Sequence, residues 1–119
     1  MQAKIAIADY IDSQADWRGK KADEYPEDER NNRAAVGLTE LAAYIRSLSD
    51  DDECLRELAS VGMVPNGSEF GPGTETSRAI SLFRFDRADE DCGEFLNSLV
   101  RLATEDALEL GKLAGEIDD

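Results

Sequence analysis

The chain has 119 residues, the length of one ordinary domain, and 41% of them are hydrophobic, which is enough to form a core. It carries 27 Asp and Glu against 13 Lys and Arg, a net charge of −14, and it contains no histidine. Bare nucleic acid and anionic membranes are therefore poor partners, because binding them requires clustered basic side chains. The lack of histidine excludes Ser-His-Asp and Cys-His catalysis and histidine-based metal sites.

The first half of the chain predicts two helices joined by a polar connection. Apolar side chains fall along one helical face over residues 3–17. The stretch 18–33 is polar, and we expect it to form the connection and the start of the next helix, with Pro26 in the first turn. Leucine and isoleucine then recur at helical spacing over residues 27–48, and Gly37 within them indicates a close helix–helix contact.

A third, shorter helix follows and is expected to end at Gly62. Its start has two possible registers. Asp50 with Glu53 resembles a capping box, and Ser49 with Asp52 offers the same spacing one residue earlier.

The second half predicts a long loop and two more helices. Residues 63–76 are rich in glycine and proline, which favours a loop that binds a ligand or is disordered. Helices are expected over 75–84 and 89–113, the latter with a wide apolar face. We therefore predict a single all-α domain over residues 1–119, a compact bundle of four to five helices with one long Gly/Pro-rich loop.

The cysteines and the short apolar runs indicate a cytoplasmic protein. Cys54 and Cys92 are isolated from each other and have no CxxC partner, so we expect reduced thiols that fill space in the core. The apolar run Ile5–Ala8 is interrupted by Asp9 and is too short for a secretory signal or a membrane span.

Pairs of carboxylates at i, i+3 spacing are the candidates for metal chemistry. Two such pairs on neighbouring helices would suit Mg²⁺, in the style of small all-α nucleotide pyrophosphatases. The pairs that would hold a metal, if one is bound, are Asp91 with Glu94 and Asp106 with Glu109. In a chain this acidic such pairs also arise by chance on solvated helix faces, which is the interpretation we favour.

Two segments are candidates for binding a partner. One is the acidic run formed by Asp50, Asp51, Asp52 and Glu53, which would attract Lys and Arg of another protein. The other is the segment 17–33, in which Trp17 and Tyr25 stand among basic and acidic residues. Trp, Tyr and Arg are enriched at binding hot spots, although Trp17 as a core anchor of the first helix is the favoured alternative.

The composition favours a non-catalytic interaction module that presents an acidic surface to a basic protein. An inhibitor that mimics nucleic acid by its charge, an antitoxin or an adaptor would fit this description. The alternative is a Mg²⁺-dependent enzyme of the pyrophosphatase type, and otherwise no cofactor is expected. A homodimer formed through the last helix is compatible with either function. A salt-adapted or GC-rich genome would explain the acidity equally well without a functional role.

Overall fold

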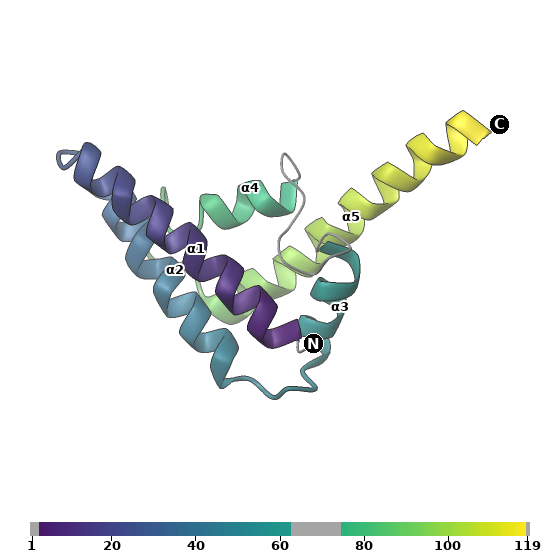
Figure 1. Cartoon of the computed structure of the whole chain (residues 1–119), viewed down its shortest axis with the longest axis horizontal. Coiled ribbons are helices and arrows are strands. Elements are labelled where there is room, and N and C mark those ends of the chain that lie inside the picture. Colours follow the sequence, from purple (N-terminus) through teal and green to yellow (C-terminus); the bar gives the residue numbers. More distant parts are fainter. Residues whose placement is uncertain (1–2, 63–74, 119) are drawn as a thin grey trace.

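The computed structural model describes residues 3–62 and 75–118, which form helices, turns and no strand. The elements are α1 (Ala3–Glu24), α2 (Glu29–Ser47), α3 (Glu53–Gly62), α4 (Glu75–Ser81) and α5 (Cys92–Asp118). Figure 1 shows α1 and α2 side by side as a hairpin, with α3 and α4 placed along α5. The prediction of an all-α bundle is confirmed.

One hydrophobic core joins all five helices. Phe83, in the turn after α4, is fully buried, and its ring centroid lies 4.4 Å from that of Phe95 on α5. The other core side chains come from every helix: Ile7, Ala8, Ile11, Ala15, Leu38, Leu41, Ala42, Ile45, Leu55, Leu58, Ile80, Leu96, Leu99 and Ala103. In α2, where leucine and isoleucine recur at helical spacing, the expected apolar face is the buried one, whereas Trp17 at the end of the face expected for residues 3–17 is 43% exposed.

The first helix is longer than predicted, and its additional residues carry part of the site described below. Residues 18–24, expected to be a connection, continue α1, and the amide of Tyr25 still bonds the carbonyl of Lys21 at 2.9 Å. Apart from Gly19, these residues are compatible with a helix, and their polarity reflects exposure rather than a loop. The connection is thus only residues 25–28, and Pro26 lies in this turn rather than in the first turn of α2.

The helix starts are set by aspartates that were only partly predicted. Asp28 caps α2 by accepting a hydrogen bond from the amide of Arg30. Asp52, rather than Asp50 or Ser49, caps α3, because its carboxylate accepts from the amide of Leu55 at 3.1 Å. The last helix begins at Cys92 rather than at residue 89 and continues to Asp118.

The fourth helix is shorter than predicted. It ends at Ser81 rather than at residue 84, and Arg84 in the following turn has a φ of 55°. That left-handed backbone conformation is incompatible with continuing an α-helix. Of the predicted loop, residues 63–74 lie outside the described part of the chain, while residues 75 and 76 belong to α4.

Gly37 does mark a close contact, but not one between two helices. A Cβ at this position would lie 2.6 Å from Cδ of Arg84, whose side chain crosses α2 at this point. Arg84 is held there by hydrogen bonds to the carbonyl of Glu90 and by an ion pair with Glu40.

Within the described ranges, no helix has the length and apolar character needed to cross a membrane.

Candidate functional site

The acidic run between α2 and α3 is partly used by the fold itself. The Lys4 amino group lies 2.8 Å from the carboxylate of Asp50 and also donates to the carbonyl of Leu48. Asp52 is the cap of α3. Asp51 and Glu53 are exposed, and neither has an ion pair with another described residue. Only these two carboxylates therefore remain open to a partner.

The carboxylate pairs considered for a metal are not brought together. Both pairs belong to α5 and its cap, and 15 residues of helix separate Asp91 from Asp106, which is about 22 Å. Asp91 accepts a hydrogen bond from the amide of Glu94 at the start of α5. The side chain of Glu109 lies outside the described part, and the described residues contain no group of three or more potential metal ligands.

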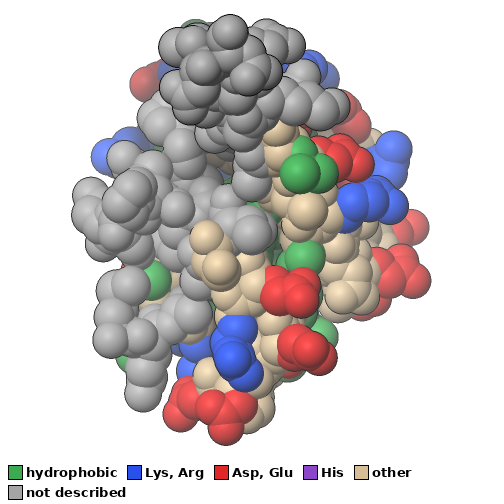
Figure 2. All heavy atoms as spheres, turned by 90° about the vertical axis from the view of Figure 1, so that its right-hand side faces the viewer, with side chains coloured by type: hydrophobic (Ala, Val, Ile, Leu, Met, Phe, Trp, Pro, Cys, Tyr) green, Lys and Arg blue, Asp and Glu red, His purple; other side chains and the backbone are tan. Residues whose placement is uncertain are grey.

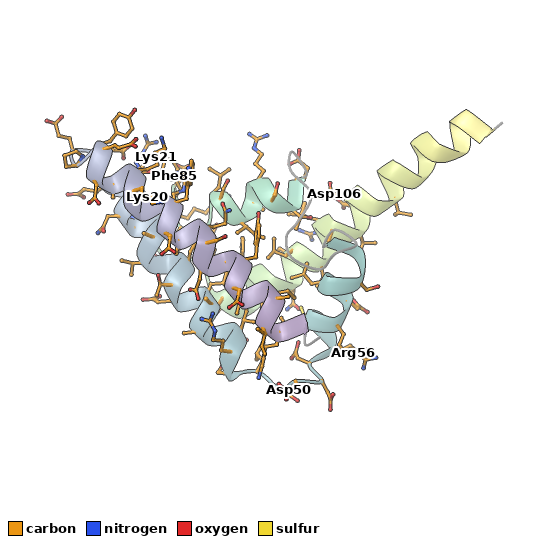
Figure 3. All side chains as sticks on the ribbon, in the orientation of Figure 1. Lys20, Lys21, Asp50, Arg56, Phe85 and Asp106 are labelled. Carbon is orange, nitrogen blue, oxygen red and sulfur yellow. The ribbon has the colours of Figure 1, made fainter. Side chains whose placement is uncertain are left out.

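Asp106 has a specific structural partner. Its carboxylate accepts hydrogen bonds from the amide of Thr76 at 3.1 Å and from the hydroxyl of Thr76 at 2.8 Å. Figure 3 shows it pointing from α5 toward the first turn of α4. Asp106 therefore supplies acceptors for the otherwise unbonded amides at the start of a neighbouring helix.

The two cysteines are half-buried thiols without the features of a nucleophile. Burial raises the pKa of both Cys54 and Cys92, and nearby carboxylates raise it further. For Cys92, the positive charge of Arg84 acts in the opposite direction without reversing the shift. Both thiols therefore remain protonated at neutral pH and are poor nucleophiles.

A groove lies at the opposite end of the α1–α2 hairpin from the acidic run. It has a volume of about 880 Å³ and is open to solvent. We call it the tip groove, and its walls are formed by Trp17, Arg18, Lys21, Glu24, Tyr25, Pro26, Glu27, Asp28 and Asn31. Lys4, the partner of Asp50, and Lys21, in the groove, are 17 residues apart on α1, so about 25 Å of helix separates the two surfaces.

The floor of the tip groove is fixed by Arg18, whose residue surface is only 7% exposed. Its guanidinium donates from Nε to the carbonyl of Ser81 at 2.9 Å, a bond that Nη2 shares, and from Nη1 to Oδ1 of Asn31 at 3.1 Å. The same group stacks on the ring of Phe85, 4.3 Å from its centroid. Burial lowers the pKa of Arg18, and the charge of Arg30 adds to this effect.

One wall of the groove is a stripe of three residues spaced four apart, two on α1 and the third, Tyr25, directly after its end. Trp17 is 43% exposed and Tyr25 is 58% exposed, so neither ring is a core anchor. Between them, the Lys21 ammonium lies 5.9 Å from both ring centroids, within the range of a cation–π interaction. It also lies 3.2 Å from the carboxylate of Glu24. The alternative that Trp17 is buried is therefore incorrect.

The other wall belongs to the strongly acidic turn between the helices. Residues 23–29, which we call the acidic tip, contain five carboxylates and no basic residue. Asp28 forms a bidentate pair with Arg30, with both distances 2.9 Å. The hydrogen bonds to Arg30 lower the pKa of Asp28 to about 2. Three further carboxylates are exposed and have no ion pair with a described residue: Asp23, Glu27 and Glu29.

Sequence reasoning found the aromatic residues of the groove but missed its floor. Ser81 and Phe85 come from α4 and the turn after it, more than 60 residues beyond Arg18. No local pattern connects them. Figure 3 shows Phe85, Lys20 and Lys21 toward the α1–α2 turn, and Asp50 and Arg56 near the connection between α2 and α3, toward the opposite end of α1.

The charges elsewhere are mixed rather than gathered on one side. Figure 2 shows red and blue side chains interspersed over the described part of one face. On α1 and α2, Arg46 pairs with both Asp9 and Asp12. At the acidic tip two of the five carboxylates are likewise paired, Glu24 with Lys21 and Asp28 with Arg30, which leaves three exposed carboxylates without an ion pair to a described residue.

No protein-family model, no curated protein and no solved structure matches the chain.

Proposed function

We propose that the protein is a non-catalytic interaction module that binds a basic protein through the tip groove. The observation that supports this most directly is the exposure of Trp17 and Tyr25 on the wall of an open groove. Large aromatic side chains at the rim of a hollow are typical anchors of a protein interface. The Trp17 ring packs over the buried Arg18 guanidinium, 4.7 Å from its centroid, and is still 43% exposed to solvent.

The rigidity of the groove also favours binding. Arg18 ties α1 to Ser81 and Asn31, so the backbone beneath the aromatic rings is held by contacts from three separate segments. A surface that is already ordered loses little conformational entropy when a partner binds. The affinity gained from the two rings is therefore not offset by the cost of ordering the site.

Charge supports a basic partner. The acidic tip borders the aromatic wall, and the whole chain has a net charge of −14. A positively charged protein is attracted over a distance of about 8–10 Å at ordinary ionic strength and is oriented toward the tip. Three carboxylates of the tip have no ion pair with a described residue: Asp23, Glu27 and Glu29. So small an acidic area favours an adaptor- or antitoxin-like contact over mimicry of a long nucleic acid, which would require an extended acidic face.

The test is a binding titration with a basic polypeptide such as polylysine, measured by calorimetry at low and high salt. We expect binding at low salt, with affinity reduced by Trp17→Leu and by Tyr25→Leu. Val36→Ala is the control, because Val36 is also an exposed apolar residue but lies outside the groove. Equal loss of affinity in all three variants, or in none, would contradict a role for the groove.

A further inference from the structure

Two cations already lie near the aromatic wall of the tip groove: the Arg18 guanidinium, 4.7 Å from the Trp17 centroid, and the Lys21 ammonium, between Trp17 and Tyr25. The second of them indicates which group of a partner the groove recognises. Building on the proposed function, we infer that the groove binds the alkylammonium group of a partner lysine between Trp17 and Tyr25. We further infer that Lys21 is an internal competitor that occupies this place in the free protein. The inference combines two aromatic faces, an adjacent carboxylate and a cation held between them.

The helix geometry explains why the three groups meet. Trp17, Lys21 and Tyr25 are spaced i, i+4, i+8, so their side chains lie one above another on one face. The amide of Tyr25 still bonds to the carbonyl of Lys21, which extends the helical register to the second ring. The Lys21 ammonium is equidistant from both centroids, at 5.9 Å, instead of extending into water away from the rings.

The chemistry of the surrounding groups suits an ammonium ion. The face of an aromatic ring attracts a lysine ammonium placed within about 6 Å of its centroid, and clusters of such faces bind methylated ammonium groups. Glu24 contributes a carboxylate 3.2 Å from Nζ of Lys21, and Glu27 and Asp28 also line the groove. Asp28 is already paired with Arg30, so Glu24 and the unpaired Glu27 are the lining carboxylates that can bind an incoming ammonium.

The internal cation is held only weakly and can be replaced. The Lys21 side chain remains 35% exposed and its carboxylate partner Glu24 remains 56% exposed. Exposed ion pairs of this kind contribute little to stability. An incoming lysine therefore displaces Lys21 toward solvent at a small cost, while the neighbouring carboxylates remain available to both cations.

The neighbouring lysine provides a matched control. Lys21→Met keeps the aliphatic stem and removes the ammonium from the groove. Lys20→Met makes the same change one residue earlier, on an exposed side chain that does not line the groove. Each variant changes the net charge by one, from −14 to −15, so general attraction of a basic ligand rises equally in both.

Trp17 is the only tryptophan, so its fluorescence reports directly on the groove. The probes are a short peptide of alternating lysine and glycine and the same peptide with every lysine acetylated. We expect the lysine peptide to change Trp17 emission and the acetylated peptide to have no effect. Lys21→Met should bind the lysine peptide about two- to fivefold more tightly than Lys20→Met, as expected for an exposed cation–π contact. Tyr25→Leu, which keeps the reporter, should weaken binding.

The outcomes separate the two claims. Equal affinity of Lys21→Met and Lys20→Met, or equal binding of the acetylated peptide, would overturn the role of the ammonium group while leaving binding at the groove intact. An emission that responds to neither peptide in any variant would overturn the proposed function as well. Circular dichroism of each variant establishes that the helices are retained.

Discussion

Arg18, in the last two turns of α1, donates two hydrogen bonds to the backbone carbonyl of Ser81, the last residue of α4. A backbone carbonyl is thus paired with a charged guanidinium that is almost entirely shielded from water. The arrangement joins the tip of the α1–α2 hairpin to the end of α4. The tip groove therefore depends on a contact between segments that are far apart in the sequence.

The first prediction concerns this contact. Arg18→Ala should lower the free energy of unfolding by about 1.5–3 kcal/mol, because it leaves the acceptors of Ser81 and Asn31 without their charged donor. Arg78→Ala, which removes an exposed arginine from α4, should change it by less than about 0.5 kcal/mol. Urea unfolding followed by circular dichroism measures both, and equal stability of the two variants would contradict the assigned role.

Two helical glycines should respond in opposite directions to alanine. Gly19→Ala adds a methyl group with nothing within 4 Å and should stabilise α1 by about 0.5–1 kcal/mol. Gly37→Ala places its methyl group 2.6 Å from Cδ of Arg84 and should destabilise the protein by about 1–3 kcal/mol. Thermal unfolding of the two variants tests the packing of α2 against the turn after α4. Stabilisation by both would show that Arg84 moves aside without cost.

Asp106 is predicted to stabilise α4. Asp106→Ala should lower stability by about 0.5–2 kcal/mol, the usual range for removal of a helix cap, because the amide and hydroxyl of Thr76 lose their acceptor. Glu105→Ala is the control, since this neighbour on α5 is exposed and has no hydrogen bond or ion pair with a described residue. Chemical unfolding of the two variants compares them directly, and equal stability would remove the capping role.

The Asp106 variant also allows a test of the alternative that the protein is a Mg²⁺-dependent enzyme. If Asp106 acts only within the fold, millimolar Mg²⁺ should leave the unfolding temperature unchanged, because an ion bound to the native state would raise it. Differential scanning calorimetry with and without Mg²⁺ makes this measurement at constant ionic strength. A rise in the wild type that is absent in Asp106→Ala would instead favour the metal-dependent enzyme.

The ion pair between Asp28 and Arg30 in the acidic tip should break only at very low pH. The pKa of Asp28 is lowered from 3.8 to about 2 by its hydrogen bonds to Arg30. A carboxyl whose pKa is lower in the folded than in the unfolded state stabilises the folded protein fully at pH values above its unfolded-state pKa. This stabilisation is lost as the pH falls from about 4 to about 2. NMR titration of the carboxyl carbons measures the midpoint directly. A midpoint near 4 for Asp28 would show that the pair with Arg30 does not persist in solution.

The sequence was sufficient for the helical class and most of the core but not for the site. Periodic leucine and isoleucine predicted α2 almost to its ends, because those side chains face the core. The polar residues 18–24 lack an apolar stripe, so their sequence predicts a connection, although they continue α1. The partners of Arg18 come from α4 and α2, and pairing at such separations leaves no periodic trace in the sequence.

We propose that a basic partner binds at the tip groove rather than at the acidic run between α2 and α3. The most direct test is an amide NMR spectrum of the labelled protein recorded during titration with polylysine. We expect the largest chemical-shift changes at residues 17–31 and at Phe85, with small changes at Asp50–Glu53. Shifts centred on Asp50–Glu53, or spread evenly over all exposed carboxylates, would contradict the proposal.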